Sequence, residues 1–69
     1  MNMSTMLDTR PEDVADKAET LLTTGRFSEA AGEFRRAATL FAYERDRGAA
    51  SRMTEAAITA ERAYEVQPL

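Results

Sequence analysis

The chain has 69 residues and a formal net charge of −3, and it contains neither cysteine nor histidine. Without cysteine it has no disulfide, thiol nucleophile or thiolate metal site, and without histidine it lacks the commonest general base and metal ligand. This length allows one domain. Because so small a chain buries only about 60% of the surface its unfolded form exposes, we expect a marginal monomer that gains stability by association.

The composition predicts an all-α protein. Residues between Pro11 and Pro68 are mostly helix formers, and the only β-branched aliphatic residues are Val14, Ile58 and Val66. The first residues lack the basic start and apolar core of a signal peptide, and no apolar run approaches the about 20 residues of a membrane span. We therefore expect a cytoplasmic protein with no membrane contact.

The first helix is predicted over about residues 11–24. Thr9 and Glu12 have the spacing of a capping box, and Pro11 falls in the first turn, where its missing N–H is not needed. Apolar residues then recur at helical spacing, at Val14, Ala18, Leu21 and Leu22. Gly25 is expected to end this helix in a left-handed conformation. Residues 1–8 before it are predicted to be a disordered arm.

The second helix is predicted over about residues 28–45, with Ser28 as its N-cap. Its apolar stripe consists of Ala30, Phe34, Ala37 and Phe41. Gly32 lies inside this helix at a cost of about 1 kcal/mol relative to alanine. Either a neighbouring backbone comes close to Gly32, or the position is a plain surface site.

The third helix is predicted over about residues 48–66, with Asp46 as its N-cap and residues 67–69 as a frayed tail. Its narrow stripe steps by three and four through Ala50, Met53, Ala57, Ala60 and Tyr64. Residues 9–66 would thus form a single three-helix domain.

Residues Val14 to Ala42 resemble a tetratricopeptide repeat. The resemblance is carried by Ala18, Leu21, Gly25, Phe27, Ala30, Phe34 and Ala37. It implies an antiparallel helical hairpin in which small residues allow close helix contact, glycine makes the turn, and leucine and phenylalanine fill the core. Three-helix domains of the microtubule-interacting and trafficking type share a similar pattern.

The sequence departs from the family at two positions. Lys17 stands where a large apolar residue is usual, and Ala42 replaces the usual closing proline, so that the second helix can run on to about Arg45. The third helix looks like the first helix of a following repeat, which makes about one and a half repeats. The resemblance implies a peptide-binding inner face, here Glu12, Ala15, Glu19 and Leu22, without the residues that clamp an acidic peptide C-terminus.

We expect the open edge of this arrangement to be buried against another protein or a second copy. Candidate interface residues are the apolar or aromatic positions Leu22, Tyr43, Met53, Ala57, Ile58 and Tyr64. Ile58 lies about 100° from Ala57 on the helix, so it either widens the apolar face or is a single exposed residue.

The middle of the chain is locally basic. Residues 26–52 contain six basic and four acidic side chains, including Arg35, Arg36, Arg45, Arg47 and Arg52. A nucleic-acid surface is one interpretation. The other, which we favour, is a solvated helix surface on which Glu33 pairs with Arg36 and Arg52 with Glu55.

The acids near the first helix start, Glu12, Asp13, Asp16 and Glu19, suit the helix dipole and lack a calcium-binding loop, so no metal site is expected. Ser28 has no evident base, and no catalytic residue or cofactor is predicted. The sequence therefore predicts a non-enzymatic adaptor or regulatory protein that binds another protein, with a homodimer favoured. The alternative is a small DNA-associated regulator that uses the arginines between residues 35 and 52.

Overall fold

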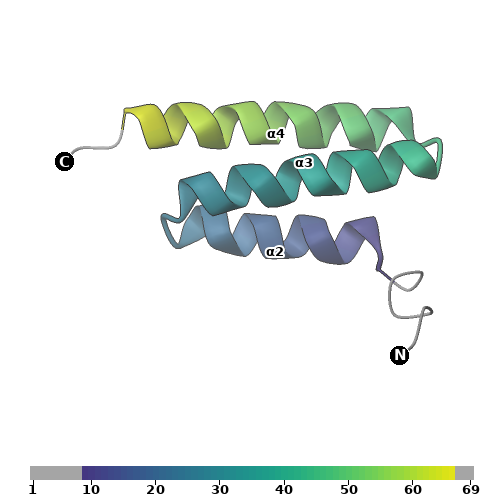
Figure 1. The fold of residues 1–69 in the computed structure, drawn as a ribbon, viewed down its shortest axis with the longest axis horizontal. Coiled ribbons are helices and arrows are strands. Elements are labelled where there is room, and N and C mark those ends of the chain that lie inside the picture. Colours follow the sequence, from purple (N-terminus) through teal and green to yellow (C-terminus); the bar gives the residue numbers. More distant parts are fainter. Residues whose placement is uncertain (1–8, 67–69) are drawn as a thin grey trace.

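The computed structural model describes residues 9–66, which form three α-helices in one layer (Figure 1). They are α2 (Pro11–Thr23), α3 (Phe27–Tyr43) and α4 (Arg47–Glu65). Consecutive helices run antiparallel, and α3 packs against both neighbours. The predicted all-α class is confirmed. The predicted arm (1–8) and tail (67–69) lie outside the described residues.

The start of α2 differs from the predicted capping box. Arg10 occupies the N-cap position in an extended conformation and makes no side-chain capping bond, so Thr9 lies one residue too early to be the cap. Pro11 follows as the first helical residue and is buried. Its fixed φ and missing N–H suit that position, and the carbonyl of Arg10 accepts from the N–H groups of Asp13 and Val14.

The end of α2 agrees with the prediction. Gly25 has φ +83°, in the left-handed region that glycine adopts without a Cβ penalty. The N–H of Gly25 donates to Leu22 and that of Arg26 to Leu21, at 3.1 and 2.9 Å. These two bonds form a Schellman motif, which satisfies carbonyls that the helix end would otherwise leave unpaired.

Both ends of α3 differ from the prediction. The helix begins at Phe27 with Arg26 as its N-cap, so the predicted cap Ser28 is the second residue of the helix. An ion pair of 2.8 Å between Arg26 and Glu29 spans the first turn. The helix ends at Tyr43, because Arg45 turns into the left-handed region at φ +64°. The Arg45 and Asp46 N–H groups donate to Ala42 and Phe41, so the second turn repeats the hydrogen bonding of the first.

The predicted cap of the third helix is confirmed. Asp46 is the N-cap of α4, and its carboxylate accepts a 3.1 Å hydrogen bond from the N–H of Ala49. Gly48 follows in the first turn. No helix in residues 9–66 combines the length and apolar character that crossing a bilayer would require.

The core of the layer consists largely of alanine. Seven of the ten buried core residues in the described part of the chain are alanines, and the others are Val14, Phe34 and Phe41. Two clusters are formed, one around Phe34 and one around Phe41, and each includes residues of all three helices. Within the single chain, α4 therefore packs on its own α3. Small side chains allow close helix contact, but each contributes little apolar area.

The layer is thin. The principal-axis extents of the molecule are 42 × 28 × 13 Å. Most domains bury their apolar faces between two layers of secondary structure. A single layer of helices leaves both broad faces open to solvent or to a partner.

Candidate protein-interaction surface

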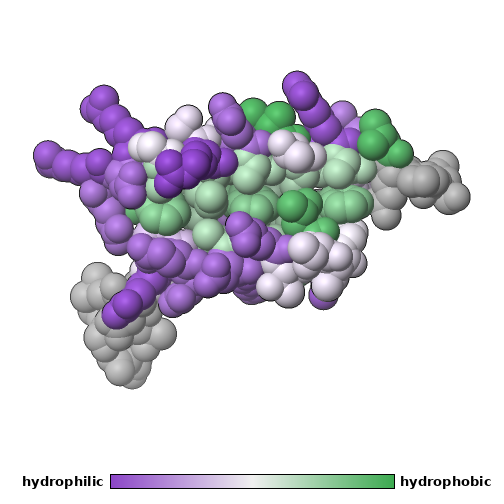
Figure 2. Space-filling view, turned by 180° about the vertical axis from the view of Figure 1, so that it is seen from behind, coloured by the Kyte–Doolittle hydropathy of each residue, from purple (hydrophilic) through white to green (hydrophobic). Residues whose placement is uncertain are grey.

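One broad face of the layer carries a continuous apolar band between α4 and α2 (Figure 2). We assign to this apolar band the half-buried residues Ala15 and Leu22 of α2 and Met53 and Ala56 of α4, which pack against the core clusters from the solvent side. Met53 contacts both clusters and so joins the two halves of the band.

Helical spacing places Ala15 and Leu22 together. The positions Glu12, Ala15, Glu19 and Leu22 step by three, four and three and therefore share one face of α2. Ala15 and Leu22 are half-buried, whereas Glu12 and Glu19 are exposed. Leu21 is about 100° from Leu22 and instead lines a groove between α2 and α3 with Lys17 and Glu33. The α2 side of the apolar band thus has an acidic rim.

The α4 side of the band has a different charge pattern. Arg52 precedes Met53 directly and lies one helical turn before Ala56, so it borders the band. The Arg52 side chain is exposed and makes no ion pair within residues 9–66. The predicted pairing of Arg52 with Glu55 is therefore wrong for the described chain, whereas the Glu33–Arg36 pair is present at 3.6 Å.

The six predicted interface residues do not form one surface. Leu22 and Met53 lie on the apolar band. Ala57, which was predicted to lie at a partner interface, is completely buried in the core of this chain, because it packs in the cluster around Phe34. Tyr43 ends α3 and is 81% exposed, while Tyr64 lies near the end of α4, against the start of α3. Because α3 and α4 are antiparallel, these tyrosines are at opposite ends of the layer.

Ile58 also lies apart from the band. It is 39% exposed. Its position is about 140° around the helix from Met53 and about 160° from Ala60, which faces the core. Ile58 is therefore an isolated apolar residue on the outer side of α4, and such residues are common on protein surfaces.

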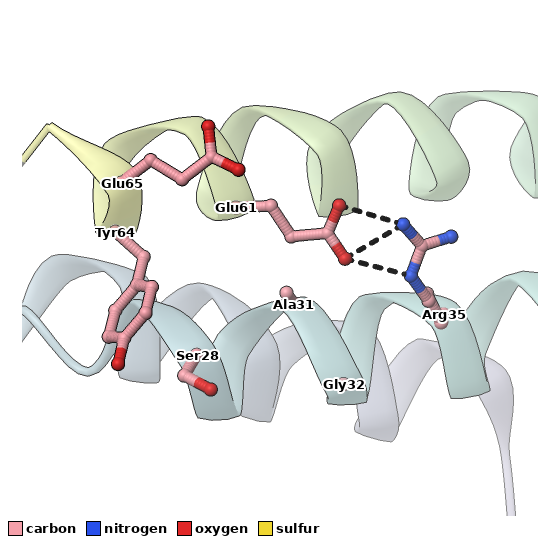
Figure 3. Close-up of a pocket in the computed structure, with 7 residues that line it drawn as sticks. All are labelled: Ser28, Ala31, Gly32, Arg35, Glu61, Tyr64 and Glu65. Atoms are coloured by element: carbon pink, nitrogen blue, oxygen red, sulfur yellow. Dashed lines mark hydrogen bonds and ion pairs between the residues drawn. The ribbon is translucent and has the colours of Figure 1, made fainter.

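A second hollow lies between α3 and α4 (Figure 3). It has a volume of about 440 Å³, with Ser28, Gly32 and Tyr64 among its lining residues. At one end the guanidinium of Arg35 donates to both carboxylate oxygens of Glu61, with distances of 2.8 to 3.2 Å. Both side chains are about half exposed, so water screens this pair. A Cβ at Gly32 would meet nothing within 4 Å, which identifies this glycine as a surface position.

The five arginines of the alternative nucleic-acid hypothesis have different environments. Arg35 is bound to Glu61 and Arg36 to Glu33. Arg45 lies in the turn between α3 and α4, Arg47 is the first residue of α4, and Arg52 borders the apolar band. Only the last three carry a cation without an ion pair inside the described residues.

The sequence indicated part of this surface. The α2 row Glu12, Ala15, Glu19 and Leu22 was expected only as the face that the tetratricopeptide resemblance implies. Ala56 was not predicted, because one alanine in an alanine-rich helix has no distinguishing signal. In the described part of the chain, no group of three acidic side chains is arranged to hold a metal ion.

Comparisons with protein-family models, with curated proteins and with solved structures found no match to this chain.

Proposed function

We propose that the chain is a non-enzymatic protein-interaction module that binds another protein surface, either a second copy or a different chain, through the apolar band. The observation that carries the proposal is the band itself, which crosses from α2 to α4 on a broad face of the layer (Figure 2). The exposed side chains of Glu12, Glu19 and Arg52 border the band and would remain at the rim of an interface.

The small core supports the same proposal. An alanine-rich core in a layer 13 Å thick buries little apolar area per residue. Covering Leu22 and Met53 would extend both core clusters into a second layer. Binding therefore adds the apolar burial that the isolated chain lacks.

The proposal includes a tetratricopeptide-like arrangement of about one and a half repeats, acting in the cytoplasm as a small adaptor or regulatory protein. Its support is the position of the signature residues. Ala18 and Ala30 are completely buried where α2 and α3 meet, Gly25 makes the turn, and Phe34 lies in the core.

Site-specific photo-crosslinking in the cells that make the protein tests this function. A photoreactive phenylalanine analogue at Glu19 is beside the band and, because Glu19 is exposed, should leave the fold intact. We expect ultraviolet light to give discrete crosslinked protein species with this variant.

The matched control carries the same analogue at Thr39, an exposed position on α3, away from the helices that form the band. The expected result is crosslinking at Glu19 without the same species at Thr39. Equal crosslinking at the two positions, or no protein adduct at either, would contradict the proposed function.

A further inference from the structure

We infer that the apolar band is covered by a second copy of this chain, in a two-fold symmetric pair that places α2 of each copy against α4 of the other. The inference rests on the proposed function and names the partner of the same surface. It is carried by the charges on the two rims of the band and by the apolar residues between them.

The two rims have opposite character. On the α2 side, the exposed carboxylates of Glu12 and Glu19 border the band, since both share the helical face of Ala15 and Leu22. Neither of these acids makes an ion pair within residues 9–66. Across the band, Arg52 is an exposed cation that has no ion pair with any other residue of the range 9–66. Each copy therefore carries both halves of a complementary pair on one face.

Two-fold symmetry makes these rims meet. In a two-fold interface the same patch is used by both copies, so it must be complementary to itself. A two-fold axis in the plane of the band and parallel to the helices brings α2 of one copy over α4 of the other. Since α2 and α4 run in the same direction (Figure 1), their starts stay at the same end, and Glu12 in the first turn of α2 is brought toward Arg52 in the second turn of α4.

The alternative two-fold arrangement is less favourable. An axis in the plane of the band but perpendicular to the helices would place α2 on α2, and the uncompensated acids of the two copies would face one another. Like charges brought together at an interface oppose association. The acidic rim therefore selects the pairing of α2 with α4.

The band supplies the apolar centre through Leu22 and Met53, and the charged residues supply the rim.

Charge reversal tests the arrangement. The dissociation constant of the pair is measured by sedimentation at low ionic strength for the wild type, Glu12→Arg and Arg52→Glu. We expect each single variant to raise it roughly tenfold, because two attractive contacts become repulsive in a symmetric pair. An equimolar mixture of the two variants should form a mixed pair with near wild-type affinity, and the double variant E12R/R52E should recover self-association. High salt should reduce all these differences.

The matched control is Asp13→Arg. It makes the same charge change in the same helical turn, but Asp13 lies about 160° from Ala15 around α2, compared with about 60° for Glu12. We expect Asp13→Arg to keep the wild-type dissociation constant within about twofold.

A wild-type chain that stays monomeric at millimolar concentration would overturn the second copy as partner. A dimer whose affinity is unchanged by both reversals, or not recovered in the mixture, would overturn the α2–α4 pairing. Both outcomes are distinct from failure of the proposed function, since crosslinks from Glu19 to a different protein would still place a partner on the band.

Discussion

The most direct test of the fold concerns the turn between α3 and α4. Arg45 adopts φ +64°, although a left-handed conformation costs a residue with a Cβ roughly 1–2 kcal/mol. Glycine avoids this cost, but its more flexible unfolded state offsets about 0.4–1 kcal/mol of the gain. Arg45→Gly should therefore raise the free energy of unfolding by about 0.5–1 kcal/mol. The side chain makes no ion pair or hydrogen bond within residues 9–66 that the change would remove.

Urea and thermal unfolding at one fixed protein concentration measure this effect, because self-association also changes apparent stability. For a domain of this size, the predicted gain corresponds to a rise of about 2–8 °C in Tm. Arg45→Ala is the matched control, since it removes the same charge but retains the Cβ. We expect it to change the free energy of unfolding by less than about 0.5 kcal/mol.

The turn between α2 and α3 allows the opposite substitution, from glycine to a residue with a Cβ. Gly25 has φ +83°, and a Cβ there would meet nothing within 4 Å, so Gly25→Ala tests the backbone conformation alone. The expected result is a loss of about 1 kcal/mol. If Arg45→Gly lowered stability, or if Arg45→Ala raised it equally, the left-handed backbone would not be the source of the effect.

Three further changes test other parts of the structure. Gly32→Ala should stabilise the chain by about 0.8–1 kcal/mol in urea unfolding, because the site is helical, exposed and free of neighbours within 4 Å; a loss would show that the glycine is needed. Asp46→Ala should cost about 1 kcal/mol through loss of the α4 cap, and Asp46→Asn should retain most of that stability. Phe34→Ala should cost about 3–5 kcal/mol and remove much of the cooperative thermal transition seen by circular dichroism, whereas a cooperative transition with unchanged Tm would contradict its place in the core.

The number and order of the helices followed from local signals. The helices were indicated by helix-forming residues and by apolar residues at a spacing of three and four. Gly25 indicated where α2 ends and α3 follows. Asp46 was identifiable as a cap because a carboxylate beside a helix start interacts with backbone groups only a few residues away. These features depend on neighbours in the sequence, so the sequence contains them.

The end of α3 was different. Nothing in the residues around Arg45 requires a left-handed backbone, and local propensity allowed the helix to continue to that position. In the structure, α4 turns back at this point and packs its alanines against Phe34 and Phe41, which fixes where α3 must stop. A tertiary constraint outweighed the local preference.

The candidate surface divides in the same way. By itself the sequence determined three helices, the Gly25 turn, the Asp46 cap and the acids near the start of α2. Each of these depends on residues within one or two helical turns of one another. Only the tertiary structure buried Ala57, separated Tyr43 from Tyr64, paired Arg35 with Glu61 and joined Leu22 with Met53 in the apolar band. The physical reason is that helix periodicity specifies which residues share a face, whereas the packing of helices decides which of those faces meet.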